Sequence, residues 1–319
     1  MHNIFHFGCI YALFGARGCI YKRVSNNTMK TTELRYFYRI LSELNNSFTH
    51  YSFVWNQFSI DYFKLLKENP DTLTKDYFNS NPFHRAHNIR FSELENEHTK
   101  TDKTLIEGIY LLIYTHYESY LKSVLSFSKG VDESIKSFED KLDDLDSDFS
   151  TLDKVFNRVG VDKSLLDSEI LDSLDYLRLK RNRLTHRNAE NISNSLNDLI
   201  KLKGVKLNSY WNLNLPSKLQ GIDFVDKENA NALTFSIVID SINIFRKASN
   251  EIDKLITEKL TIDRITQQII IPDFKRLQKG KLNGLKKERI ISKFKRFCDS
   301  EYAMEIDDQK IELLISSIA

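Results

Sequence analysis

Apolar and aromatic residues recur at helical spacing along most of the 319-residue chain, beginning with residues 31–68. The aromatic positions of this first segment are Tyr36, Phe37, Tyr38, Phe48, Tyr51, Phe53, Trp55, Phe58, Tyr62 and Phe63. Their spacing predicts one or two helices that pack against another layer. The dipeptides Asn69-Pro70 and Asn81-Pro82 then interrupt the pattern and indicate a break.

Residues 101–127 form the most apolar segment and are predicted to be helical. At 100° per residue, one broad face carries Leu105, Ile109, Leu112, Ile113, Tyr120 and Val124. The opposite side carries Leu111, Tyr114, Glu118 and Leu125. A helix that is apolar on both sides is expected to be buried between two layers, inside one chain or across a dimer interface. If Glu118 is buried there, its carboxylate needs a partner.

The rest of the chain has the same helical texture, with fewer aromatic residues. Residues 164–187 and 228–260 are predicted to be helices, with an irregular stretch at 206–225 and shorter helices from residue 261 onward. Residues 132–153 are strongly acidic, which favours a solvated helix end or loop over a docking site for a basic partner. Only 4 Pro and 10 Gly occur, which favours long helices, so we predict an all-α fold.

Four segments are expected along the chain. Residues 1–28 are interpreted as an upstream extension without stable order, with Met29 as the natural start, because a polar helix-like run begins there. The apolar part of this extension is too short to span a membrane and has no basic signal-peptide start, so no membrane association is expected. Residues 29–94 form an N-terminal helical segment, 95–260 a helical core and 261–319 a basic helical tail.

The composition limits the classes of function. The formal net charge is only +2, so any affinity for nucleic acid must come from local basic patches. Three scattered cysteines match no zinc or disulfide spacing, which favours a reducing cytoplasm. His84, His87 and His98 lack further metal ligands nearby and are interpreted as surface histidines, so no metal is expected. No glycine-rich phosphate loop or nucleophile motif is present, and no cofactor is expected.

The most informative stretch is residues 177–188, in which Arg181 precedes His186 by five positions. Arg181 falls on the same helical stripe as the apolar residues Ile170, Leu174, Leu177 and Leu184. An unpaired guanidinium would be costly in that stripe. Asn182 and His186 lie four residues apart and are neighbours along its flank. The structural alternative is a buried Arg181 paired with a carboxylate, with His186 as a cation at the end of the helix.

Two segments of the chain resemble motifs of the HEPN family of ribonucleases, and they occur in the same order as in that family. The run Arg181-Asn182-x-x-x-His186 is similar to the family's arginine–histidine signature, in which a polar residue follows the arginine. Upstream, the first core helix of the toxin-type members is similar to Leu111-Leu-Ile-Tyr-Thr-His-Tyr-Glu-Ser-Tyr-Leu-Lys122. The resemblance covers residues 95–260 and implies a HEPN-like antiparallel helical bundle with additional N- and C-terminal helices. Asn188 stands where some members carry a modifiable tyrosine, so that mode of control is not supported.

The resemblance also implies a homodimer that joins two such motifs in one cleft and cuts RNA without metal. The expected catalytic residues are Arg181, Asn182, His186 and Glu118. His186 would transfer protons near neutral pH, Arg181 would neutralise phosphate charge, and Glu118 would fix Arg181. Asn182 would orient the imidazole or bind a phosphate oxygen.

Basic residues suggest where RNA binds. The candidates are Arg178, Arg183 and Arg187 beside the motif, and Lys286, Lys287 and Arg289 in the tail. In the tail, basic residues alternate with Phe274, Phe294 and Phe297, a combination typical of RNA-tracking surfaces. The alternative is a solvated amphipathic face that balances the acidic segment.

Three classes of function remain open at this stage. The first is a toxin or anti-phage ribonuclease, whose partners would be RNA and a cognate antitoxin or sensor protein. The second is a catalytically silent HEPN scaffold that binds RNA or a protein. The third is a helical interaction module with no role in nucleic acid binding. A monomer in which Arg181 forms an internal ion pair shielded from water would favour this third class.

Overall fold

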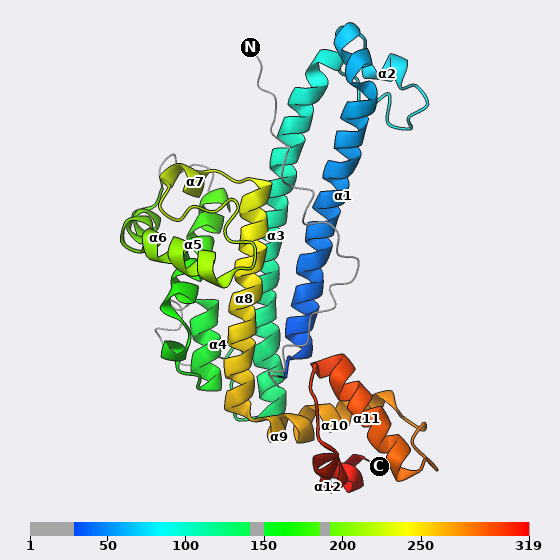
Figure 1. Ribbon diagram of the computed structural model, residues 1–319, viewed down its shortest axis with the longest axis vertical. Coiled ribbons are helices and arrows are strands. Elements are labelled where there is room, and N and C mark those ends of the chain that lie inside the picture. The colour runs from blue at the N-terminus through cyan, green and yellow to red at the C-terminus, as the bar shows by residue number, and fades with distance from the viewer. Residues whose placement is uncertain (1–28, 141–149, 186–191, 319) are drawn as a thin grey trace.

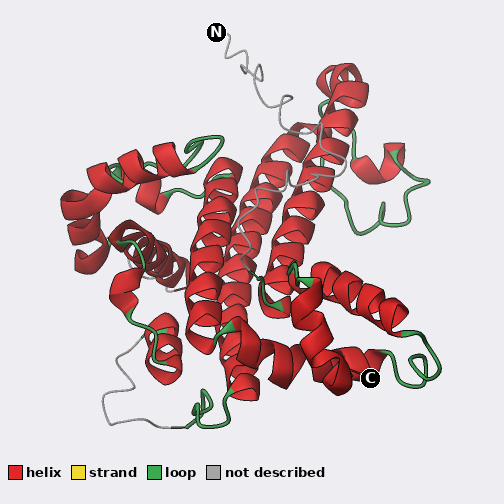
Figure 2. Cartoon of the chain, turned by 60° about the horizontal axis from the view of Figure 1, so that its bottom comes forward, coloured by secondary structure: helices red, strands yellow, loops and turns green. Residues whose placement is uncertain are grey.

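The computed structural model describes residues 29–140, 150–185 and 192–318, and every regular element in these ranges is a helix (Figures 1 and 2). The only extended pairing within them is an isolated bridge between Leu73 and Arg90. The predicted all-α class is therefore confirmed. None of the described helices is long and apolar enough to cross a membrane. The predicted upstream extension, residues 1–28, lies outside the described residues.

Three long helices lie lengthwise side by side in the centre of the molecule: α1 (Thr32–Glu68), α3 (Leu94–Val131) and α8 (Phe235–Leu260) (Figure 1). Helix α1 runs antiparallel to the other two. Its 37 residues form one helix about 55 Å long, at 1.5 Å per residue. At its far end, α2 (Thr74–Tyr77) and the short turn Phe91–Glu93 connect it to α3.

Helix α3 is covered on more than one side, as its two apolar faces predict. It contacts α1 and α8, and also α4 (Thr151–Val159) and α5 (Ser168–Thr185). Helices α6 (Asn194–Asn214) and α7 (Lys227–Asn231) complete the group that lies beside α8 (Figure 1). Leu112 is an exception to the predicted burial, because 46% of it is exposed.

The C-terminal tail folds into short helices, as expected. These are α9 (Ile262–Ile265), α10 (Ile271–Leu277), α11 (Lys287–Tyr302) and α12 (Asp308–Ile318), with a π-helical turn at Thr266–Ile270. The tail packs against the start of α1, where the Lys30 amide donates to the Tyr302 carbonyl at 2.9 Å. Phe274 and Phe294 are completely buried and belong to the core. The interpretation of these two rings as part of an RNA-stacking surface is therefore wrong.

A buried carboxylate fixes the start of α1 to α8. Asp253 accepts hydrogen bonds from the Thr31 amide, at 3.0 Å, and from the Thr31 hydroxyl. The same hydroxyl oxygen accepts from the Leu34 amide and caps the helix. Burial raises the pKa of Asp253 to about 6, against the lowering effect of the bonds from Thr31.

Two predicted boundaries were wrong. Residues 206–214 are helical, because the buried face of α6 continues through Leu207 and Trp211, whose indole donates to Ser173 at 2.6 Å. The predicted helix at 228–260 is broken between α7 and α8, and Thr234 caps the second part. The turn at Gly221, which precedes α7, approaches α8 closely. A Cβ atom on Gly221 would lie 2.4 Å from the backbone nitrogen of Ile237. Only glycine fits there without a shift of the backbone.

Candidate active site on helix α5

Helix α5 carries the motif residues and packs its apolar stripe into the core. Ile170 and Leu177 are buried almost completely, and Leu174 is 8% exposed. One turn further along the stripe, the side chain of Arg181 remains 32% exposed. Arg181 therefore lies where the buried stripe meets the surface of the helix.

Three side chains surround the Arg181 guanidinium. Its Nη2 atom lies 3.8 Å from Oε2 of Glu118 on α3, and its Nη1 atom donates to Oδ1 of Asn182 at 3.1 Å. The guanidinium carbon stands 5.2 Å from the centre of the Tyr114 ring. Glu118 has a second contact, from the Thr151 hydroxyl at 3.5 Å. The expected contact between Glu118 and Arg181 is thus present.

The Tyr114 ring forms one side of the site around the Arg181 guanidinium. It lies four residues before Glu118 on α3, so both side chains project from the same face of that helix. Burial raises the pKa of Tyr114, and the nearby Glu118 carboxylate raises it further. Tyr114 therefore stays a neutral phenol at physiological pH and offers an aromatic face to the guanidinium. The sequence pattern placed Tyr114 on the same side of the helix as Glu118, but Tyr114 was not predicted to be a site residue.

The ion pair of Arg181 and Glu118 is neither shielded from water nor fully exposed to it. About one third of each side chain is accessible to solvent, and 3.8 Å is too long for a good hydrogen bond. The Arg181 guanidinium is consequently held in place yet still has donor groups available for another anion. An arrangement of this kind can bind a phosphate or a carboxylate from outside the chain.

The basic residues predicted beside Arg181 have different environments. Arg178 is paired with Asp175 on the same helix at 2.7 Å. Arg183 has a buried Nη1 atom for which no hydrogen-bond partner is found among the described residues. Two further predicted site residues, His186 and Arg187, lie outside the described residues, as does Asn188. Helix α5 is described up to Thr185, directly before them.

Lys180 is a buried cation that the sequence analysis missed. Only 1% of it is exposed, and its Nζ atom donates to the carbonyls of Asn229, Ala230 and Ala232 at the end of α7. These are the carbonyls left free where α7 ends, and a helix C-terminus attracts a cation. Burial lowers the pKa of Lys180 to about 7, and Arg183 adds to this effect. No sequence signal distinguished this lysine from the partly exposed cations Arg178, Arg181 and Arg183.

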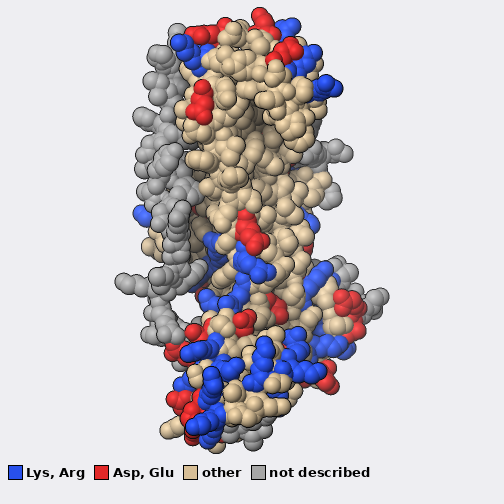
Figure 3. Space-filling model, turned by 90° about the vertical axis from the view of Figure 1, so that its right-hand side faces the viewer, with Lys and Arg blue, Asp and Glu red and all other residues tan. Residues whose placement is uncertain are grey.

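The tail residues predicted to bind RNA lie away from Arg181. Lys286, Lys287 and Arg289 lie at the start of α11, and Figure 1 shows α5 and α11 on opposite sides of the central helices. Lys287 is paired with Glu312 at 3.5 Å. Within the described residues, six exposed tail cations make no ion pair: Lys275, Lys279, Lys281, Lys286, Arg289 and Arg296. These six, all exposed, are called the basic C-terminal surface below, and Figure 3 shows Lys and Arg gathered at this end.

The histidines considered as metal ligands do not come together. His98 stacks on Trp55 with 3.8 Å between ring centres and contacts the Tyr51 hydroxyl at 3.0 Å. His84 contacts the Asn81 carbonyl at 2.7 Å. No group of three or more potential metal-ligating side chains occurs within the described ranges. His98 is therefore part of an aromatic cluster and not an ordinary surface residue.

Comparisons with protein-family models, with curated proteins and with solved structures give no significant match to this chain. Any assignment of function must therefore rest on the motif and on the geometry around Arg181.

Proposed function

We propose that this protein is a metal-independent endoribonuclease of the HEPN type, which cleaves RNA through attack by the 2′-hydroxyl. The observation that carries the proposal is the contact of Arg181, five positions before His186 in the sequence, with Glu118 and Tyr114. This contact joins the two motifs that the resemblance rests on, although they are about 60 residues apart in the chain.

Arg181 has the chemistry needed to bind the reacting phosphate. Attack of the 2′-oxygen on phosphorus places extra negative charge on the phosphate oxygens. A permanent cation with a planar set of donors stabilises that charge best when it is already oriented. Glu118 and Tyr114 supply the orientation, and the exposed third of Arg181 remains for the substrate.

Proton transfer is assigned to His186. One base must take the proton of the 2′-hydroxyl, and one acid must protonate the departing 5′-oxygen. The products are then a 2′,3′-cyclic phosphate and a 5′-hydroxyl end, with no net uptake of water or protons. In a homodimer, two copies of His186 would divide the roles of base and acid. Asn182, which already contacts Arg181, would orient the imidazole or a phosphate oxygen.

Product analysis tests the proposal. Total RNA is incubated in EDTA with the wild-type protein, with the double variant Arg181→Ala/His186→Ala and with Arg90→Ala. Arg90 is a matched control, because its side chain is 60% exposed and is paired with Asp71, away from the site. We expect the wild type and Arg90→Ala to produce 5′-hydroxyl ends and cyclic phosphates, and the double variant to produce none. Equal cleavage by all three proteins would overturn the assignment.

A second candidate is a catalytically silent scaffold that binds a protein partner. The observation in its favour is a set of large apolar side chains exposed along the far half of α1: Phe53, Val54, Ile60 and Phe63. The internal pairing of Arg181 with Glu118 also agrees with an interaction module, although the pair is too exposed to be a dry structural contact. Absence of cleavage by any of the three proteins would favour this candidate.

If the protein is instead an active ribonuclease that serves as a toxin or defence effector, it would need a cognate antitoxin or sensor to restrain it in the cytoplasm.

A further inference from the structure

A groove lies on the side of α3 opposite to Glu118. It has a volume of about 630 Å³ and is formed by α1 and α3, with Glu301 from the end of α11. His116, Ser119 and Ser123 supply the wall from α3. At 100° per residue these three project from α3 roughly opposite to Tyr114 and Glu118. The groove is therefore separate from the candidate active site.

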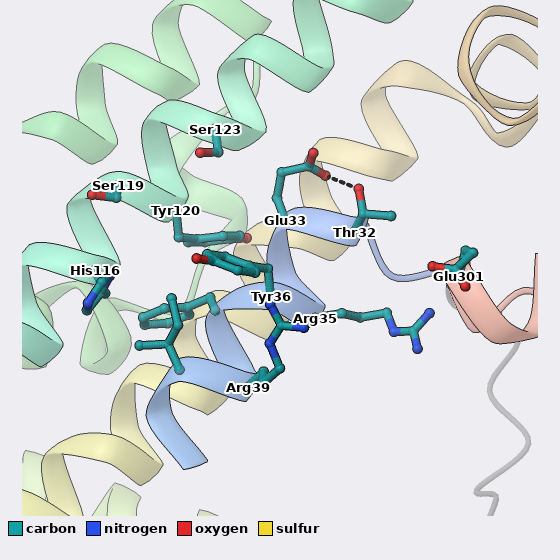
Figure 4. Close-up of a pocket in the computed structure, with 12 residues that line it drawn as sticks. Thr32, Glu33, Arg35, Tyr36, Arg39, His116, Ser119, Tyr120, Ser123 and Glu301 are labelled. Carbon is teal, nitrogen blue, oxygen red and sulfur yellow. Dashed lines mark hydrogen bonds between the residues drawn. The ribbon is translucent and has the colours of Figure 1, made fainter. Parts of the chain in front are cut away.

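The wall from α1 combines an exposed aromatic ring with two arginines. Tyr36 is 57% exposed, and the Arg39 guanidinium stands 4.9 Å from the centre of its ring. Figure 4 shows Tyr36 and Arg39 facing the space between the two helices, with Arg35 extending toward Glu301. Arg35 also donates to the Ser300 carbonyl, which attaches the groove to α11. A flat ring, guanidinium groups and hydroxyls are the groups that hold an unpaired base and its phosphate.

Helix α11, whose Glu301 lines the groove, begins in a basic region. Figure 3 views the side that carries α1, and the part formed by the C-terminal helices is rich in Lys and Arg. Helix α11 connects the two regions, because the basic C-terminal surface includes residues at its start and Glu301 at its end lines the groove. Phe274 and Phe294 are buried and Phe297 is only partly exposed, whereas Tyr36 in the groove is exposed. Tyr36 therefore offers the more accessible ring for a base.

We propose that the groove between α1 and α3 binds single-stranded RNA, with one unpaired base on Tyr36, its phosphates on Arg35 and Arg39, and the strand continuing over the basic C-terminal surface. This site is distinct from the cleavage site proposed around Arg181 and does not depend on it. One carboxyl of the groove, Glu33, is partly buried, which raises its pKa, and it accepts a hydrogen bond from the Thr32 hydroxyl at 2.9 Å. A carboxyl here can also accept a hydrogen bond from a ribose hydroxyl or a base amino group.

Binding is measured by fluorescence anisotropy with a labelled single-stranded 20-nucleotide RNA and a duplex of the same length. The protein is the full chain carrying Arg181→Ala, so that cleavage cannot interfere. We expect the single strand to bind more tightly than the duplex. Tyr36→Ala/Arg39→Ala should weaken binding by about tenfold or more, the range for one stacked base. Tyr36→Phe should retain most of the affinity, because the ring is kept.

A salt-dependence measurement and a control variant complete the test of the groove. Arg35→Ala/Arg39→Ala should reduce the steepness of the salt dependence, since each lost phosphate contact removes about 0.7 from the slope of log K against log salt for single strands. The matched control is Phe63→Ala/Arg85→Ala, which removes an exposed ring and an exposed arginine far from the groove. Equal weakening by this control would overturn the proposal, as would unchanged binding in Tyr36→Ala/Arg39→Ala.

The same assay separates this proposal from the nuclease proposal. Competition by uridine monophosphate as effective as that of the strand would assign the groove to a free nucleotide and overturn strand binding. If RNA binding needs Tyr36 and Arg39 but the chain with an intact Arg181 does not cleave RNA, this inference stands and only the nuclease proposal is removed. Cleavage that persists while these variants bind RNA normally would do the reverse.

Discussion

Arg181 on α5 faces Glu118 on α3, with 3.8 Å between Nη2 and Oε2 and about a third of each side chain open to solvent. Two helices that are distant in the sequence thus present one guanidinium at a defined position. A pair that is this exposed contributes little to folding stability, roughly 0 to 1 kcal/mol. Its value in the proposed enzyme is orientation of the cation, which leads to a direct test.

Replacing Glu118 by glutamine should separate catalysis from stability. Glutamine keeps the size of the side chain and its contact with Thr151 but loses the charge that holds Arg181. We expect kcat to fall by about tenfold with little change in KM, because a positioning interaction of about 1.4 kcal/mol is lost in the transition state. The melting temperature should change by less than about 2 °C. Unchanged kcat would show that Glu118 does not position Arg181.

The composite cleft can be tested by mixing two inactive variants. If one cleft uses residues from both protomers, mixed dimers of Arg181→Ala and His186→Ala still contain one intact arginine and one intact histidine. We therefore expect partial recovery of RNA cleavage after the two proteins are unfolded and refolded together, and none in either protein alone. Sedimentation velocity of the wild type gives the oligomeric state independently. A monomer with full cleavage activity would contradict the homodimer.

Lys180 should contribute strongly to stability. In Lys180→Met, the carbonyls of Asn229, Ala230 and Ala232 lose the lysine donor, and a buried carbonyl without a donor costs about 1–3 kcal/mol. Of these three residues Ala230 is the buried one, so we expect a loss of about 1–3 kcal/mol in urea unfolding. Lys64→Met is the matched control, because that side chain is 86% exposed and should change stability by less than about 0.5 kcal/mol. Similar losses in both variants would show that Lys180 is not special.

Asp253 predicts a pH dependence of unfolding. Its folded-state pKa is about 6 and its ordinary value 3.8, so the folded protein holds this proton more tightly than the unfolded chain. The stabilisation from this proton is complete below pH 3.8 and is lost as the pH rises through 6. Relative to Asp253→Asn, the wild type should therefore lose about 2 kcal/mol between pH 4 and pH 7. Urea unfolding of both proteins across this range measures the difference.

The exposed carboxylate Asp61 supplies the control for that experiment. The variant Asp61→Asn should follow the wild type at every pH, because Asp61 is exposed and bonds only to Gln57 on the same helix face. A constant stability difference between the wild type and Asp253→Asn at all pH values would contradict the raised pKa of Asp253.

Much of the fold was predictable because helical periodicity is a local property. The apolar faces of residues 101–127 predicted that α3 lies between layers, and the stripe through Leu177 placed Arg181 at its edge. The boundaries that failed depend on distant residues. Helix α6 continues because Trp211 finds a hydrogen-bond partner in Ser173, and the break before α8 is stabilised by Lys180 of another helix. The HEPN resemblance and the domain limits at residues 94 and 260 stay predictions.

The sequence by itself determined the class of fold, the helix that carries Arg181 and the residue types available for chemistry, because these depend on spacing within single helices. Only the tertiary structure decided which charges meet. It paired Arg181 with Glu118, buried Lys180 and Phe294, and left Tyr36 exposed beside Arg39. It also separated the basic C-terminal surface from α5 by the width of the central helices. Burial and pairing between distant segments depend on how whole helices pack, and no local pattern encodes that.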